Sequence, residues 1–205
     1  SVPDIYAAGD AVQVKHYVTG NDALISLAGP ANKQGRIIAD NICGGDSRYL
    51  GSQGSSVIKV FDMTAATTGI NETNAKKSGL EVDTVILSPM SHAGYYPGGK
   101  VMTMKVVFEK ESYRLLGAQI IGYEGVDKRI DVLATAIHAG LKATQLKDLD
   151  LAYAPPYSSA KDPVNMAGFM IDNIAKGTLK QWHLEDMDKI SKDKSAVLLD
   201  VRTVD

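Results

Sequence analysis

Three strand-like segments in the middle of the chain constrain the fold more than any other feature of the sequence. Residues 82–87, 101–109 and 114–121 are rich in β-branched and apolar side chains, and residues 101–109 alternate in polarity. An amphipathic helix follows over residues 126–139, with apolar positions at helical spacing and a glycine at its end. Consecutive strands with short connections predict an antiparallel sheet, and the helices that back it predict an α+β fold.

The chain before the sheet has a different character. Residues 4–10 predict a short apolar strand that ends in Gly-Asp, and residues 24–43 predict a helix that begins with small residues. The glycine- and serine-rich residues 44–55 then read as a linker. After it, residues 57–61 predict another strand and residues 71–78 a short helix closed by glycine.

Composition narrows the functional class. The chain has 22 basic and 24 acidic residues, which gives no electrostatic reason to expect nucleic acid or a membrane surface as a partner. No apolar run reaches the length of about 18 residues that suggests a membrane span. The single cysteine, Cys43, excludes an internal disulfide and favours a cytoplasmic protein. The four histidines show no metal-ligand spacing, so no metal site is predicted.

Residues 153–169, YAPPYSSAKDPVNMAGF, form the most distinctive stretch. Two prolines stiffen the backbone between Tyr153 and Tyr157, while Asp162 and Pro163 are suited to cap and begin a helix. A second aromatic segment, residues 91–99, places Tyr95 and Tyr96 between glycines. From the residues alone, buried tyrosines with satisfied hydroxyls and a ligand or subunit contact both remain open.

This stretch resembles the C-terminal signature of the coenzyme A-disulfide reductase group of flavin-dependent pyridine nucleotide-disulfide oxidoreductases. NADH oxidases and persulfide reductases are close relatives of that group. The resemblance implies that residues 54–177 are the dimerisation domain of a homodimer. It also implies that Tyr153 and Tyr95 lie near the partner subunit's redox cysteine and act in catalysis, with Tyr96 as an alternative to Tyr95.

The same resemblance extends to the start of the chain. DIYAAGD is similar to the second flavin fingerprint of the family, in which the Asp binds the ribityl chain of FAD. It implies that Asp10 has that role, that Ala11 offers its backbone nearby, and that the N–H of Ala28 approaches the flavin. Residues 1–53 would then be the end of an α/β FAD-binding domain.

Cys43 does not match the family's redox cysteine, which lies in an earlier segment. Because Cys43 ends a predicted helix before two glycines, it is expected to be a small buried or half-buried residue. The His-Pro-Thr and Glu element of two-cysteine relatives is replaced here by YAPPYSS. This favours the single-cysteine branch, whose redox cysteine would lie outside this chain.

Residues 178–205 are predicted to be a linker followed by the first strand of a rhodanese-like domain, because SAVLLDVRTVD resembles such a strand. Both ends are therefore expected to be cut from a longer protein. The intact protein is expected to use FAD and NADH or NADPH to reduce coenzyme A disulfide or a persulfide, and the fragment alone to be inactive. An NADH oxidase or peroxidase and a non-catalytic dimerisation module remain as alternatives.

Overall fold

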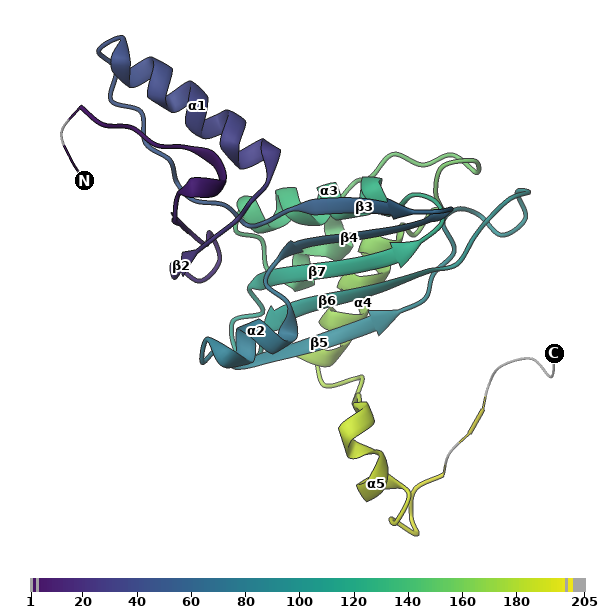
Figure 1. The fold of residues 1–205 in the computed structure, drawn as a ribbon. Coiled ribbons are helices and arrows are strands. Elements are labelled where there is room, and N and C mark those ends of the chain that lie inside the picture. The colour runs from purple at the N-terminus through teal and green to yellow at the C-terminus, as the bar shows by residue number, and fades with distance from the viewer. Residues whose placement is uncertain (1, 3, 198, 201–205) are drawn as a thin grey trace.

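The centre of the molecule is a five-stranded antiparallel sheet with the order β3-β4-β7-β6-β5 (Figure 1). It is seen in a computed structural model that describes residues 2, 4–197, 199 and 200. The strands are β3 (Ser56–Val60), β4 (Met63–Gly69), β5 (Val82–Leu87), β6 (Met102–Glu109) and β7 (Leu115–Gly122). The predicted α+β class, an antiparallel sheet with packed helices, is confirmed.

Two helices cover one face of this sheet (Figure 1). Helix α3 (Val126–His138) packs on β4 and β7, and helix α4 (Pro163–Ala175) packs beside it and on β5. A 3₁₀ helix, η2 (Ala143–Asp148), lies against α4. Fully buried side chains from the sheet and the helices meet in this layer and include Met104, Val106, Leu116, Leu133, Leu146 and Ile171. Their burial away from water is the main stabilising contribution to the domain.

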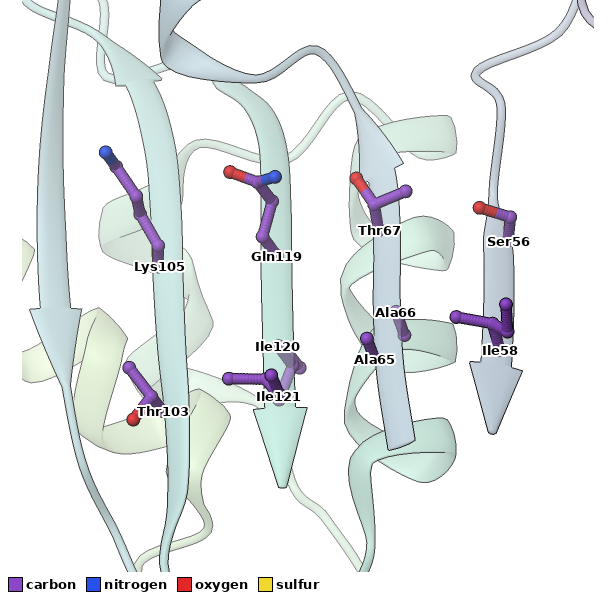
Figure 2. Close-up of a pocket in the computed structure, with 10 residues that line it drawn as sticks. All are labelled: Ser56, Ile58, Ala65, Ala66, Thr67, Thr103, Lys105, Gln119, Ile120 and Ile121. Atoms are coloured by element: carbon purple, nitrogen blue, oxygen red, sulfur yellow. The ribbon is translucent and has the colours of Figure 1, made fainter. Parts of the chain in front are cut away.

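The opposite face of the sheet carries side chains in two rows across the strands (Figure 2). Strand register aligns one polar row of Ser56, Thr67, Gln119 and Lys105. A second, more apolar row aligns Ile58, Ala65, Ile121 and Thr103. Ala66 and Ile120, which alternate with these residues along β4 and β7, point to the helix-covered face and are buried. The alternation is what a half-buried antiparallel sheet requires.

Strand β4 was missed in the sequence. Its residues, MTAATTG, are small and lack a strong alternation of polar and apolar side chains. The strand is defined by pairing instead, since Ala65 lies opposite Ile58 on β3 and Ile121 on β7. It ends at Gly69, where φ is +67° and an added Cβ would lie 2.1 Å from the carbonyl oxygen of Leu116. Only glycine fits this close approach.

The first part of the chain forms a small unit beside the sheet. It contains η1 (Gly9–Ala11), the two-residue strands β1 (Val14–Lys15) and β2 (Asp22–Ala23), and α1 (Ala28–Ile42). The predicted strand over residues 4–10 is wrong, because no described residue pairs with this segment and it leads into η1. The predicted helix is present but begins at Ala28 rather than at residue 24.

The chain after α4 runs back along the edge strand β5. The Nε2 of His183 lies 2.9 Å from an Asp83 carboxylate oxygen, and Gln181 donates to the carbonyl oxygen of Thr84 over 3.1 Å. Two short helical turns follow, η3 (Leu184–Asp186) and α5 (Met187–Ile190). The rhodanese-like strand predicted within residues 195–205 lies partly outside the described residues, and the part that is described is not a strand. Within the described ranges, no helix is long and apolar enough to cross a membrane.

Helix α2 (Glu72–Lys77) is tied to the sheet by an ion-pair network. A Glu72 oxygen lies 2.5 Å from the Nζ of Lys105 on β6, and its other oxygen lies 2.5 Å from the Nζ of Lys76. The Glu72 side chain is 26% exposed, so the network is partly shielded from water. Hydrogen bonds from Lys105 and then Lys76 lower the pKa of Glu72 to about 2.

Replacement of Glu72 by Gln is therefore expected to lower the free energy of unfolding by about 1 kcal/mol near neutral pH. Because the folded-state pKa lies below the ordinary value of 4.5, this contribution is present above that value and is lost as the pH falls toward about 2. Urea unfolding of wild type and Glu72→Gln should show the difference shrinking as the solution is acidified. Glu111→Gln, at an exposed turn position, is the control. A difference that stays constant with pH would contradict the assignment.

Candidate functional site

The phenol groups of Tyr95 and Tyr153 meet at one end of the sheet. Their hydroxyl oxygens are 2.9 Å apart, although the two residues are 58 positions apart in the sequence. Tyr95 lies in the segment between β5 and β6, and Tyr153 lies between η2 and α4. Tyr95 is 77% exposed and Tyr153 is 46% exposed, so the pair is open to a ligand. The structure thus brings together the two predicted catalytic tyrosines, while their role in catalysis stays a prediction.

The neighbouring Tyr96 takes a different direction. Its ring packs edge-on against the buried His92, with the ring centroids 5.6 Å apart and the planes at 81°. Its backbone N–H donates to the carbonyl oxygen of Ala93 and closes a turn. Of the two adjacent tyrosines, Tyr95 is therefore the one that reaches Tyr153.

The two tyrosine-bearing segments are held together by the backbone as well. The N–H of Ala93 donates to the carbonyl oxygen of Ser158 over 3.0 Å. The Pro155-Pro156 turn closes through bonds from the N–H groups of Tyr157 and Ser158 to the carbonyl oxygen of Ala154. The site therefore stands on a stiff turn beside an anchored loop, which limits the motion of both phenols.

The hydrogen bond between the two phenols stabilises the protonated form of Tyr153 and raises its pKa above the ordinary value. The Tyr153 phenol therefore keeps its proton at neutral pH. One O–H is used in the mutual bond, and within the described part of the chain no other partner takes the second. The pair can offer this O–H to an anion that binds beside it, such as a thiolate leaving group.

A buried polar cluster behind the pair was missed in the sequence. Arg129 is 1% exposed and Asp162 is 2% exposed, and the Arg129 Nη2 lies 3.0 Å from an Asp162 carboxylate oxygen. Asp162 also accepts from the N–H of Val164 over 3.0 Å, which confirms it as the predicted cap of α4. The sequence held a signal for this buried arginine, because Arg129 lies on the same face of α3 as the apolar residues Val126 and Leu133.

The residues predicted to bind flavin lie together at another corner. Asp10 and Ala11 belong to η1, Ala28 is the first residue of α1, and all three are exposed. The N–H of Gly9 donates to the side chain of Gln34 over 2.7 Å, which fixes η1 against α1. An exposed carboxylate and the unpaired N–H groups expected at a helix start suit a polar, electron-rich ligand. In Figure 1 this corner and the loop after β5 lie at opposite ends of the sheet.

Cys43 and the histidines considered in the sequence analysis form no cluster like the tyrosine pair among the described residues. Cys43 is exposed, so the expectation of a buried or half-buried position was wrong; it follows the last turn of α1, which faces away from the sheet. His138 stacks on Tyr17, with ring centroids 5.1 Å apart, and has a structural role. No group of three or more His, Cys, Asp or Glu side chains among the described residues could hold a metal ion.

Comparison with known proteins gives consistent matches over most of the chain. The family profile of the pyridine nucleotide-disulphide oxidoreductase dimerisation domain matches residues 55–163. Coenzyme A disulfide reductase of Staphylococcus epidermidis is 37% identical over 170 residues, which are 82% of this chain and 38% of that protein. The chain thus spans little more than a third of this curated relative.

Two solved structures extend the similarity to three dimensions. The structure of reduced Bacillus anthracis CoADR-RHD superimposes with a TM-score of 0.89 at 50% identity, over 93% of this chain and 34% of that one. The NAD-dependent persulfide reductase from A. fulgidus superimposes with a TM-score of 0.85 at 44% identity, over 89% of this chain and 34% of that one.

Replacement of Tyr95 by Phe is expected to return the pKa of Tyr153 to the ordinary range of a tyrosine, because the phenol loses its hydrogen-bond partner. Incorporation of 3-fluorotyrosine and ¹⁹F NMR titration would follow each phenol, with Tyr153→Phe used to assign its resonance. Tyr96→Phe is the matched control and should leave the titration of Tyr153 unchanged. An unchanged titration in Tyr95→Phe would show that the two phenols do not interact.

Proposed function

Because the chain belongs to the pyridine nucleotide-disulphide oxidoreductases, whose dimerisation domain it contains, we propose that it is part of a flavin- and NAD(P)H-dependent reductase. Its substrates would be coenzyme A disulfide or persulfides of coenzyme A and other thiols. The relatives named above support this substrate class. The observation that carries the proposal is the exposed phenol pair, Tyr95 and Tyr153, with hydroxyls 2.9 Å apart.

The tyrosine pair would act on the sulfur that leaves. A cysteine thiolate, placed outside this chain by the family resemblance, attacks one sulfur of the disulfide and forms a mixed disulfide. The original S–S bond breaks, and the coenzyme A thiolate leaves with the electron pair. The free O–H of the pair stabilises this thiolate or gives it a proton. The raised pKa of Tyr153 keeps this phenol protonated at neutral pH, so it stays in the hydrogen bond that orients the pair.

FAD would bind at the η1–α1 corner. Asp10 would hold the ribityl chain, Ala11 would offer its backbone, and the N–H of Ala28 would approach the ring. The exposed carboxylate and the helix start provide acceptors and donors that fit these contacts. When bound, FAD supplies the two-electron link between the nicotinamide and the cysteine.

The separation of the two sites favours a homodimer with shared sites. The η1–α1 corner and the loop after β5 lie at opposite ends of one chain (Figure 1). The tyrosine pair would therefore complete the flavin and cysteine site of the partner subunit. A matching dimerisation-domain profile supports the same arrangement.

The outer surface of α3 and α4 is the face we assign to the partner. Met166 and Phe169 on α4 are 38% and 41% exposed. An apolar groove adjoins α3 and is lined by Val132, Ala136, Leu141, Leu149 and Leu151. Apolar area of this kind is typical of the centre of a stable subunit interface. This face also supports the second candidate, in which the isolated chain acts only as a dimerisation module.

Two further assignments rest on the sequence. Residues 178–205 would lead into a rhodanese-like domain, as the resemblance of SAVLLDVRTVD suggests. The 205-residue chain by itself would show no NADH-dependent turnover, because the redox cysteine and the nicotinamide site are assigned to other parts of the protein. An NADH oxidase or peroxidase remains the alternative, and it would turn over oxygen or peroxide without need of the tyrosine pair.

Replacement of Tyr153 by Phe in the intact protein is expected to lower kcat with coenzyme A disulfide by about 10- to 1,000-fold, because the leaving thiolate loses a proton donor. NADH oxidation should be followed in parallel with coenzyme A disulfide, a coenzyme A persulfide, peroxide and oxygen. Tyr123→Phe is the matched control, because Tyr123 is an exposed tyrosine directly after β7. Fast turnover of oxygen or peroxide at the same rate in wild type and Tyr153→Phe would assign the protein to the oxidase branch.

Replacement of Phe169 by Glu is expected to weaken self-association at least about tenfold, because a charge would be buried at the centre of the interface. Sedimentation velocity over a range of concentrations measures this directly. Ile58→Glu places the same charge on the opposite face of the sheet, where Ile58 is 61% exposed. The assignment of the helical face is wrong if Ile58→Glu dissociates the dimer and Phe169→Glu does not.

A further inference from the structure

Arg129 is a buried cation at which both tyrosine-bearing segments meet. Its Nη2 donates to the carbonyl oxygen of Ser91 over 2.9 Å, four residues before Tyr95. The same nitrogen lies 3.3 Å from the carbonyl oxygen of Tyr157 and 3.1 Å from the Oγ of Ser158, four and five residues after Tyr153. One guanidinium thus contacts the start of the first segment and the end of the second.

The other side of the guanidinium is anchored to both helices. Its Nε donates to an Asp162 carboxylate oxygen over 3.1 Å, and its Nη1 donates to the carbonyl oxygen of Gly125 over 3.2 Å. Ser158 completes the cluster, since its Oγ accepts from Arg129 and donates to Asp162 over 2.7 Å. Every nitrogen of Arg129 therefore has an acceptor, and these acceptors lie on three separate segments of the chain, at Ser91, at Gly125 and over residues 157–162.

Stability alone does not explain a charge pair in this position. Removing two charges from water is costly, and well-packed apolar residues can often replace a buried pair without loss of stability. What apolar residues cannot do is bind the carbonyl oxygens of Ser91, Tyr157 and Gly125 at once. The guanidinium also lies against Gly125, where any other residue would clash, because a Cβ at this position would lie 2.1 Å from the Arg129 Nη1.

We propose that Arg129 is a positioning residue that fixes the segment carrying Tyr95 against the segment carrying Tyr153. It does not contact either phenol. It sets the place of the two backbones from which the phenols reach each other. Its consequence for turnover rests on the proposed function, whereas its effect on the geometry of the pair does not.

Replacement of Arg129 by Lys separates the effect of its positive charge from the effect of its hydrogen-bond geometry. Arg129→Lys keeps a cation that can pair with Asp162, but a single ammonium cannot reproduce the planar fork that spans Asp162, Ser91 and Tyr157. The helix cap at Asp162 and the net charge of the cluster would remain. Arg114→Lys is the matched control, because Arg114 is half-exposed and contacts Glu109 and the carbonyl oxygen of Val18.

The test uses the 3-fluorotyrosine-labelled protein and ¹⁹F NMR titration of Tyr153, assigned with Tyr153→Phe. In wild type the phenol titrates above its ordinary range because Tyr95 is its partner. In Arg129→Lys we expect this upward shift to be lost, with a change of the Tyr153 resonance at neutral pH, while Arg114→Lys behaves as wild type. A Tyr153 resonance and titration identical to wild type in folded Arg129→Lys would overturn the proposal.

Ser158→Ala provides a second route if Arg129→Lys does not fold. It removes one hydroxyl that bridges Arg129 and Asp162 and leaves both charges in place. We expect the same displacement of the Tyr153 titration toward the ordinary range, smaller in size. An unchanged Tyr153 in folded Ser158→Ala would then overturn the proposal.

A double-mutant cycle in the intact protein gives the catalytic consequence. If Arg129 acts through the pair, Arg129→Lys lowers kcat by about tenfold or more in wild type and has little further effect in Tyr153→Phe. Equal losses in both backgrounds would overturn a role through the pair. Should the intact protein fail to reduce any coenzyme A disulfide or persulfide, the proposed function fails, and the NMR titration still decides the role of Arg129.

Discussion

The ion pair between Arg129 and Asp162 is the interaction on which the tyrosine-bearing end of this domain depends. Arg129 belongs to α3, and Asp162 caps α4, so the pair joins the two helices that cover the sheet. Ser158 and the carbonyl oxygens of Ser91 and Tyr157 add the two segments that carry the phenols. A single buried contact therefore couples the packing of the helices to the geometry of the site. Because each group in the cluster has a partner, the low-polarity surroundings strengthen the cluster.

The sheet supplies the frame for this cluster. Buried residues on β7 face α3, and the pleat sends their neighbours to the opposite face (Figure 2). Antiparallel pairing brings the loop after β5 and the turn before α3 to the same end of the sheet (Figure 1). The segment before α4 reaches this end because η2 packs on α4 and returns the chain past Leu146. Segments far apart in sequence are thus placed beside each other by ordinary core packing.

Much of this arrangement could be predicted from the sequence, and the exceptions have physical causes. Strands β5 to β7 and helix α3 were predicted because their apolar residues follow a clear period. Strand β4 was missed because Ala and Thr gave no such period. Residues 4–10 were wrongly predicted as a strand, because apolar composition cannot supply a pairing partner. The resemblance selected Tyr95 and Tyr153, but only the fold shows that Tyr95 rather than Tyr96 reaches Tyr153. Arg129 was overlooked because most of its partners lie 28 to 38 residues away.

The distance between the two predicted sites bears on how such a chain could act. A phenol pair at one end of the sheet cannot serve a flavin corner at the other end of the same molecule (Figure 1). Two copies lying side by side can satisfy both sites at once if their two-fold axis is perpendicular to the line that joins the sites, because each end of one chain then lies near the opposite end of the other. Rigid support of the pair then matters more than it would within one chain. In the proposed dimer the phenols would have to arrive in position together when the subunits dock, and a fixed Arg129 cluster would set that position before docking.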